Sequence, residues 1–244
     1  AVAHNGNLVD AQEVRNGLEH TGSIFSTTSD TEVLIHLLAK SQSDSLAERV
    51  AEALMSVKGA YSIVFLTETR MVAVRDPNGF RPLALGRLNG AYVVASETCA
   101  FDLIEAEFIR EIDPGEMVVI DKDGMKSYRP FKEVAPSPCI FEFVYFARPD
   151  SMLDDISVYK ARLRMGQALA RKILRDWPDH DIDVVIPIPD TSRTAALPLA
   201  YDLDVKYREG FIKNRYIGRT FIMPGQAERR SSIRKKLSPI PLEL

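Results

Sequence analysis

The first sixty residues repeat apolar positions every three or four places, which is the spacing of amphipathic helices. The opening Ala1–Asn7 is the exception, because it has the pattern of a strand followed by a turn. The spacing predicts three helices, over about Asp10–His20, from Ser29–Glu32 onward, and over Ser43–Val57. Polar residues at the helix starts can accept hydrogen bonds from free N–H groups.

From residue 60 to 130 the apolar positions alternate, which is typical of antiparallel strands. Asn89-Gly90 and Asp123-Gly124 mark two tight hairpin turns. We also expect one short helix near Phe101–Phe108. The predicted strands are Ala60–Leu66, Met71–Arg75, Leu83–Arg87, Ala91–Ala95, Glu116–Ile120 and Met125–Tyr128.

Pro130–Pro138 is rich in proline and reads as a linker, after which strands and helices alternate. This order predicts a doubly wound α/β unit with a parallel sheet, of which few strands are present. Its predicted elements are a strand over Ile140–Ala147, a helix over Ser157–Trp177, a strand over Ile182–Ile188, and a helix over Thr191–Tyr201 that Pro198 should bend.

The composition is that of an ordinary globular protein, with 45% hydrophobic and 27% charged residues in 244 positions. It excludes a disordered chain, a coiled coil and a fibre. Two cysteines suit a reducing compartment, and the longest apolar run, Val57–Leu66, is too short to cross a membrane. We expect an internal fragment, because Ala1 begins within a strand and the last residues form no closing element; a processed mature chain is the alternative.

Positive charge is concentrated in Arg208–Lys236, which holds nine Lys or Arg and two Glu. This stretch carries +7 in a chain whose net charge is −3. A local basic segment on an acidic chain favours a specific anionic ligand over a general polyanion. A solvated basic helix over Gln226–Leu237 is the simpler alternative.

Three polar groups in the first half could carry chemistry. Asn5-Gly6 can offer a side-chain amide and a backbone N–H to an oxyanion, although most Asn-Gly pairs are only turns. The cluster Ser26–Glu32 can bind a ligand or simply cap a helix. The turn Asp76–Leu83 contains an arginine and could be a hairpin connection with one salt bridge.

Two polar groups in the second half suit phosphate. Thr191 and Ser192 stand at a predicted helix start, where hydroxyls and free N–H groups bind phosphate or a hydrated cation, or act only as a cap. Lys213–Ile222 joins three cations to a glycine, and lysine and arginine can clamp phosphoryl oxygens. The four histidines are scattered, and no GxGxxG or P-loop occurs.

Taken together, these segments resemble the glutamine phosphoribosyl pyrophosphate amidotransferases, or amidophosphoribosyltransferases. Four of the segments are shared with other glutaminases of the N-terminal-nucleophile class, namely Ala3–Leu8, Thr27–Glu32, Arg75–Leu83 and Ala95–Thr98. Two more are specific to this family, Cys139–Ser151 and Lys213–Ile222.

The resemblance implies two incomplete domains. Residues 1–135 would form most of an N-terminal-nucleophile glutaminase with an αββα sandwich, and residues 136–244 the first part of a type I phosphoribosyltransferase α/β domain. The glutaminase would release ammonia from glutamine, and the transferase would use it to displace pyrophosphate, giving 5-phosphoribosylamine in the first committed step of purine synthesis. The family's nucleophilic cysteine should lie before Ala1, so we expect this segment alone to be inactive.

The resemblance also assigns roles to single residues. Asn5 and Gly6 would form the oxyanion hole, and Asp30 would pair with the α-ammonium of glutamine. The phosphoribosyl pyrophosphate contacts would be Ser192, Lys213, Arg215 and Arg219. Tyr216 and Ile222 would line the ammonia passage, Thr191 would lie at the magnesium site, and Cys139 would match an iron–sulfur ligand of cluster-bearing relatives.

The implied cofactor is Mg²⁺, and an iron–sulfur cluster is the less favoured addition. Expected partners are glutamine, phosphoribosyl pyrophosphate, purine nucleotide feedback inhibitors and further copies of the chain, in the cytoplasm, without nucleic acid or membrane. Two other hypotheses remain open. The chain could be a regulatory binding module that lost its nucleophile, or a nucleic-acid-binding protein that uses Arg208–Lys236.

Overall fold

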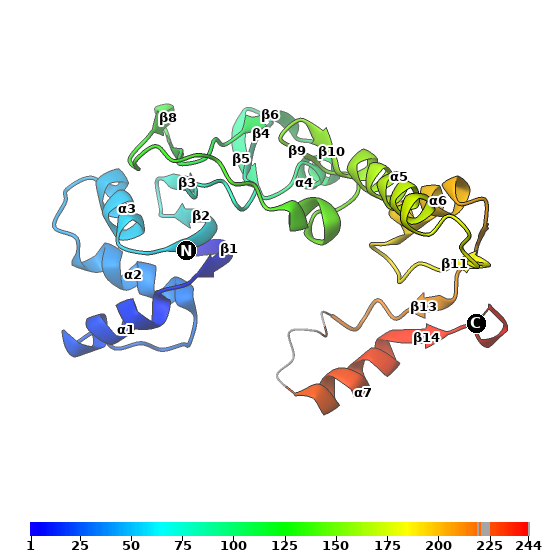
Figure 1. The fold of residues 1–244 in the computed structure, drawn as a ribbon. Coiled ribbons are helices and arrows are strands. Elements are labelled where there is room, and N and C mark those ends of the chain that lie inside the picture. The colour runs from blue at the N-terminus through cyan, green and yellow to red at the C-terminus, as the bar shows by residue number, and fades with distance from the viewer. Residues whose placement is uncertain (219, 221–224, 244) are drawn as a thin grey trace. The chain divides into compact units, whose positions relative to one another are not determined.

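The computed structural model describes all residues except Arg219, Phe221–Pro224 and Leu244. The chain divides into two compact units (Figure 1). Unit 1 comprises Ala1–Glu142 and Ser151–Asp155, and unit 2 comprises Phe143–Asp150 and Ile156–Leu244. The domain boundary expected between residues 135 and 136 stays a prediction.

Unit 1 contains two antiparallel sheets, which combine hairpin neighbours with strands that are distant in sequence. The first sheet has the order β1–β2–β3–β7–β8 and the second has the order β5–β4–β6. Their strands are β1 (Val2–Leu8), β2 (Gly59–Leu66), β3 (Met71–Arg75), β4 (Ala84–Leu88), β5 (Ala91–Ala95), β6 (Glu107–Glu111), β7 (Met117–Asp121) and β8 (Gly124–Tyr128).

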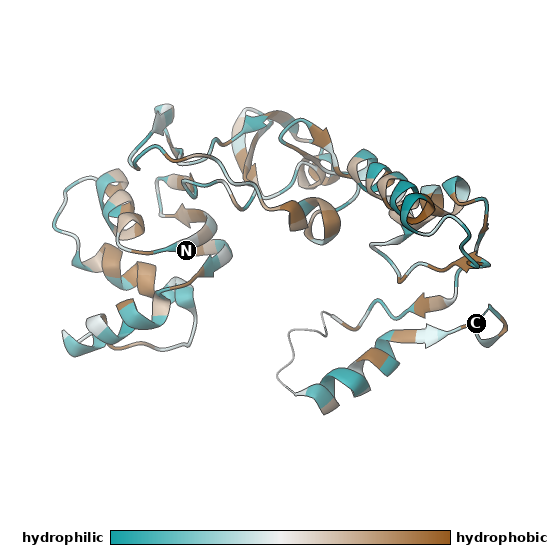
Figure 2. Cartoon of the chain, viewed as in Figure 1, coloured by the Kyte–Doolittle hydropathy of each residue, from teal (hydrophilic) through white to brown (hydrophobic). Residues whose placement is uncertain are grey.

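Three helices contribute to a core with one face of the first sheet. These helices are α1 (Ala11–His20), α2 (Asp30–Lys40) and α3 (Leu46–Met55). Leu34 and Leu54 from the helices join Ile63 and Val72 from the strands, and all four are almost completely buried. Figure 2 shows the hydrophobic stretch of α2 in brown.

The other face of the first sheet has its own apolar cluster. Because side chains alternate along a strand, Ala73 and Val118 point away from the residues in the helical core. They pack with Leu83, Leu85 and Ile112, which lie in or beside the second sheet. Unit 1 therefore layers helices, one sheet and a second sheet, in agreement with the expected sandwich.

Unit 2 contains one parallel strand–helix–strand unit, which begins at Val184 and not at the predicted strand Ile140–Ala147. Helices α5 (Val158–Asp176) and α6 (Arg193–Asp202) pack together, and β11 (Val184–Val185) pairs in parallel with β12 (Lys206–Tyr207). Gly166 of α5 lies directly against the backbone of α6, because an added Cβ would come 2.0 Å from the Ala195 oxygen.

The basic end of the chain contains a two-stranded antiparallel sheet and a helix. Strand β13 (Phe211–Lys213) pairs antiparallel with β14 (Leu237–Pro239), and the exposed helix α7 (Gln226–Lys236) precedes β14. The remaining elements are α4 (Cys99–Ile104), the π-helix Glu142–Phe146, β9 (Met152–Leu153), β10 (Ile156–Ser157) and the 3-10 helix Pro241–Glu243. No helix of the described residues is both long and apolar enough to span a bilayer.

The structure corrects three expected elements. The predicted strand Ile140–Ala147 is helical over Glu142–Phe146, where the Arg162 guanidinium binds two carbonyl oxygens. The predicted strand Ile182–Ile188 is only Val184–Val185, and Pro187 in its second half cannot donate to a ladder.

The third correction concerns the predicted helix Phe101–Phe108. The helix α4 ends at Ile104, because Glu105 adopts the left-handed conformation with φ of 58°. Residues Glu107–Glu111 then form β6, which pairs with β4. A left-handed residue commonly ends a helix, and pairing with a distant strand is not visible in local spacing.

Close contact between β1 and β2 gives a testable consequence at Gly59. A Cβ there would lie 2.3 Å from the Asn7 oxygen and 2.8 Å from the Leu8 Cα, both of which are backbone atoms. We expect Gly59→Ala to destabilise the fold by about 2 kcal/mol, because the paired strands must separate. Urea unfolding followed by circular dichroism measures this change.

Gly17 supplies the matched control, because an added Cβ there has no neighbour within 4 Å and the residue lies within α1. Gly17→Ala should leave stability unchanged or raise it by up to about 1 kcal/mol, since alanine favours helices. Equal effects at the two glycines would contradict the close approach of the strands.

Candidate functional site

The register of β1 on β2 decides which way Asn5 points. Asn5 lies opposite Ser62, whereas His4 and Gly6 lie opposite Ile63 and Tyr61. Ile63 and Tyr61 belong to the helix-facing core, and directly paired residues project to the same face. Asn5 therefore projects to the other face of the sheet, away from the helices.

Two side chains on that other face bind the Asn5 amide. Arg81 Nη2 donates to Asn5 Oδ1 at 2.8 Å, and Asn5 Nδ2 donates to Ser96 Oγ at 3.2 Å. A guanidinium group has donors only, so its contact identifies the amide oxygen and leaves Nδ2 as the donor end. One of the two Nδ2 hydrogens is used by Ser96.

Gly6 combines a close approach with an outward N–H group. Its φ is 152°, and a Cβ would lie 2.0 Å from the Ala60 oxygen, so no other residue fits. Ala1 and Leu66 exchange both backbone hydrogen bonds, so they form a hydrogen-bonded pair. Hydrogen-bonded and non-hydrogen-bonded pairs alternate along an antiparallel ladder, and Gly6 falls in a non-hydrogen-bonded pair. Its N–H therefore points away from β2, toward the outer edge of the described sheet.

Asp30 is bound to that same edge. It is the first residue of α2, and its Oδ2 accepts from the outward N–H of Leu8 at 2.9 Å. Gly6 and Leu8 present successive outward N–H groups, about 7 Å apart along a strand. The backbone pairing thus brings the Gly6 N–H and the Asp30 carboxylate to one edge.

His4 adjoins Asp30 on the helix-facing side. Its Nδ1 lies 3.0 Å from Thr31 Oγ1 and 3.7 Å from Asp30 Oδ1. Burial lowers the pKa of His4, and the negative charge of Asp30 partly opposes that shift. The imidazole is therefore more readily neutral than usual, and it packs the start of α2 against β1.

The loop before α2 is organised by Glu32. Its carboxylate accepts from the backbone N–H groups of Ser26 at 2.7 Å and Thr27 at 2.8 Å, and from the Thr27 hydroxyl. These hydrogen bonds lower the pKa of Glu32 to about 2. The cluster Ser26–Glu32 thus caps the start of α2 and holds Asp30 at the edge of β1, and Arg15 Nη1 donates to its Thr27 carbonyl oxygen at 2.7 Å.

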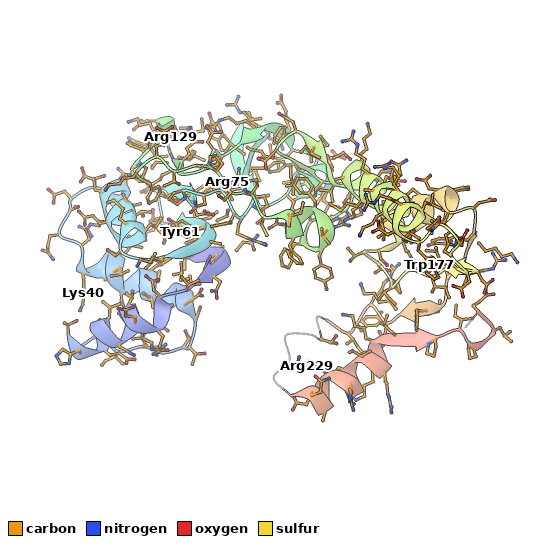
Figure 3. All side chains as sticks on the ribbon, viewed as in Figure 1. Lys40, Tyr61, Arg75, Arg129, Trp177 and Arg229 are labelled. Carbon is orange, nitrogen blue, oxygen red and sulfur yellow. The ribbon has the colours of Figure 1, made fainter. Side chains whose placement is uncertain are left out.

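The turn after β3 is built on two buried charged residues. Asp76 is completely buried and accepts from the N–H groups of Asn78 at 2.9 Å and Phe80 at 3.0 Å. Burial raises the pKa of Asp76, and the N–H donors around it oppose the shift. Arg75, which is labelled in Figure 3, donates to the carbonyl oxygens of Arg81, Ile112 and Gly79 at 3.0 to 3.2 Å.

The sequence predicts a hairpin connection with one salt bridge at this turn. The structure shows instead a network of hydrogen bonds from Arg75 and to Asp76 that fixes the backbone carrying Arg81. Arg81 and Ser96 were not singled out, although both lie within segments that carry the family resemblance. The available signal was two arginines around a Pro-Asn-Gly turn, which is more positive charge than a hairpin needs.

In unit 2, Lys213 binds Asp190, which directly precedes Thr191 and Ser192, the hydroxyl residues predicted to bind phosphate. Lys213 Nζ donates to Asp190 Oδ2 at 2.7 Å, next to Thr191 and Ser192. The hydrogen bond from Lys213 lowers the pKa of Asp190. Ser192 Oγ donates to the Ile188 oxygen at 2.6 Å, so its hydroxyl closes the turn.

A cavity of about 740 Å³ opens beside this turn, entirely within unit 2. Thr191, Ser192 and Lys236 contribute to its wall, which is otherwise mainly apolar.

Arg193 pairs with Glu209, and Tyr207 donates to the same carboxylate at 2.8 Å. Burial and this hydrogen bond raise the pKa of Tyr207 to about 12.

Of the other predicted loop residues, Arg215 and Tyr216 do not line the cavity. Tyr216 is fully exposed, and Arg215 is also exposed, close enough to Asp190 for its charge to contribute to the lowered pKa of that carboxyl. Arg219 and Ile222 lie outside the described residues. Their expected roles therefore stay predictions.

The residues that the structure describes do not form a resident metal centre. No group of three or more histidine, cysteine or acidic residues suited to a metal occurs in the described part of the chain. Thr191 offers one hydroxyl, and the neighbouring Asp190 is paired with Lys213 and Arg193. Cys139 is a free cysteine, and one thiolate does not hold an iron–sulfur cluster.

Comparison with known proteins places the chain among glutamine amidotransferases. A family model described as "Glutamine amidotransferase domain" matches residues 1–102. The solved structure of the B. subtilis glutamine phosphoribosylpyrophosphate amidotransferase complexed with ADP and GMP has a TM-score of 0.83 and 47% identity, covering 98% of this chain and 52% of that one. A second, titled "Structure of the allosteric regulatory enzyme of purine biosynthesis", has a TM-score of 0.84 and 48% identity, covering 98% and 50%.

Curated relatives make the likeness more specific. The amidophosphoribosyltransferase of Bacillus subtilis is 48% identical over 98% of this chain and 49% of its own length. That of Pseudomonas aeruginosa is 51% identical over 99% and 52%, and that of Escherichia coli is 46% identical over 97% and 50%. The chain is similar to amidophosphoribosyltransferases over nearly its whole length and spans about half the length of these relatives.

The buried turn after β3 gives the prediction for this site. In Asp76→Asn, one side-chain oxygen becomes an NH₂ group that faces backbone N–H donors. We expect a loss of roughly 2 kcal/mol in unfolding free energy, because a buried donor loses its acceptor. Asp123→Asn, at an exposed hairpin turn, should change stability by less than about 0.5 kcal/mol. Similar urea midpoints for the two variants would contradict this role of Asp76.

Proposed function

We propose that the complete protein containing this chain transfers the amide nitrogen of glutamine to 5-phosphoribosyl pyrophosphate. The products are 5-phosphoribosylamine, glutamate and pyrophosphate, in the first step of purine biosynthesis. The relatives that match nearly the whole chain are named for this activity. The observation that supports it best is the common edge of β1, shared by the Gly6 N–H and Asp30 beside Asn5.

In the glutaminase half-reaction, Asn5 and Gly6 would stabilise the oxygen of the attacked amide. The negative charge on that oxygen develops only in the transition state, so fixed donors lower the barrier rather than tighten substrate binding. The carboxylate of Asp30 would pair with the α-ammonium group of glutamine. The nucleophilic cysteine would come from residues outside this chain, and we therefore expect the chain by itself to show no glutaminase or transferase turnover.

In the transferase half-reaction, the Asp190–Ser192 turn and Lys213 would meet phosphoribosyl pyrophosphate. Lysine is a strong point donor to phosphate oxygens. Lys213 is paired with Asp190, so a phosphate would have to compete with that carboxylate. Arg215 and Arg219 would add positive charge, and Tyr216 and Ile222 would shield the ammonia path from water.

Magnesium enters this proposal as part of the substrate, because it accompanies pyrophosphate groups. The described residues offer the Thr191 hydroxyl and no carboxylate cluster, which fits a metal that arrives with the substrate. An iron–sulfur cluster at Cys139 is not proposed. Purine nucleotides are proposed as regulators, in keeping with the ADP and GMP bound to the B. subtilis relative. We also propose a cytoplasmic homo-oligomer that binds no nucleic acid.

The oxyanion role of Asn5 is tested by Asn5→Ala in the complete protein. Loss of one preorganised donor should lower kcat for glutamate release by about 10²- to 10³-fold, with little change in KM for glutamine. The matched control is Asn16→Ala, which removes an exposed amide of α1 whose Oδ1 accepts from Gln12 Nε2 at 2.8 Å. An unchanged kcat in Asn5→Ala would refute the assignment.

The phosphate role of Lys213 is tested by Lys213→Met. Calorimetry of phosphoribosyl pyrophosphate binding to the complete protein should show about a 10-fold weaker Kd, because one charged hydrogen bond is lost. Lys206→Met removes an exposed lysine of β12 in the same unit and should leave Kd unchanged. Equal losses in both variants would indicate only a general charge effect.

A further inference from the structure

The orientation of the Asn5 amide is set by its neighbours and not by its own strand. The amide could turn over about its last side-chain bond, which would exchange the oxygen and the NH₂ group. Arg81 Nη2 donates to the oxygen at 2.8 Å, and Ser96 Oγ accepts from the nitrogen at 3.2 Å. A turned amide would place its NH₂ group against the guanidinium, where neither group can accept.

Arg81 is in turn held firmly from both ends. Its carbonyl oxygen accepts from Ser62 Oγ at 2.9 Å and from Arg75 Nε at 3.0 Å, so the backbone at this point is fixed. Its Nη1 forms an ion pair with Glu142, whose side chain is only 6% exposed. A buried carboxylate partner keeps the guanidinium in place as well as charged.

We propose that Arg81 is the positioning residue of the oxyanion hole, acting through Asn5 alone. This inference rests on the proposed glutaminase function. The guanidinium keeps Asn5 Nδ2 directed as a donor before substrate arrives, and the charge on Oδ1 polarises the amide and strengthens its N–H groups as donors. Arg81 touches neither substrate nor nucleophile in this scheme.

Glu142 completes the arrangement by supporting Arg81. It is the last residue of unit 1 before the chain passes into unit 2 at Phe143. Ser151, at which the chain returns to unit 1, donates to Glu97 Oε2 at 2.7 Å, next to Ser96. Arg81 is thus paired with the residue at which the chain leaves unit 1, and Ser96 adjoins a residue that is bonded to Ser151, where the chain returns.

The test is a double-mutant cycle of Arg81→Met and Asn5→Ala in the complete protein, followed by glutamate release. Arg81→Met should lower kcat by about 10²-fold, the cost of a misplaced catalytic group, and leave KM for glutamine unchanged. The double variant should equal Asn5→Ala, because the proposal has Arg81 act on the reaction through Asn5. The control Arg87→Met, at an exposed arginine beside Tyr92, should retain wild-type kcat.

The outcomes separate this proposal from the proposed function. If the two effects multiply, or if Arg81→Met retains full kcat, the positioning role is refuted while the glutaminase stands. If Asn5→Ala has no effect, the oxyanion assignment itself fails. Should Arg81→Met not fold, Glu142→Gln offers the same cycle with a smaller expected loss, since it keeps the side-chain shape and removes the charge that anchors Arg81. A Glu142→Gln effect that persists unchanged in Asn5→Ala would also overturn the proposal.

Discussion

The antiparallel pairing of β1 with β2 places Asn5 and Gly6 and, through the Leu8 N–H, ties Asp30 to the same edge. Its register sends Asn5 to the face opposite the helices and turns the N–H groups of Gly6 and Leu8 to the outer edge. A shift by one residue would reverse both assignments, because side chains and N–H groups alternate with period two. Gly6 and Gly59 allow the strands this close approach, since an added Cβ at either would strike backbone of the other strand.

Around this pairing, charged side chains serve as internal supports. Arg75 and Asp76 satisfy carbonyl and N–H groups of a turn that would otherwise be buried without partners. Such groups are costly to bury, and they become stabilising only when their hydrogen bonds are complete. The turn delivers Arg81 to Asn5, so a structural network in the core continues directly into the proposed catalytic amide.

Local periodicity predicted the helices α1, α2, α3 and α5 and both hairpins, because each depends on contacts between residues close in sequence. It failed where distant residues decide. The segment Glu142–Phe146 has apolar residues suited to a strand, yet Arg162 of α5 binds the carbonyl oxygens of Phe143 and Ala147 and favours a helical turn. Strand β6 was missed because its partner β4 lies across the intervening α4.

By itself, the sequence determined the family, the layered fold of unit 1 and the candidate residues Asn5, Gly6, Asp30 and Lys213. Only the tertiary structure decided what holds them. Arg81 and Ser96 lie 76 and 91 residues from Asn5, and no local pattern records a contact at that separation. The physical reason is that hydrogen bonds between remote side chains depend on strand register and layer packing, which exist only once the chain has folded.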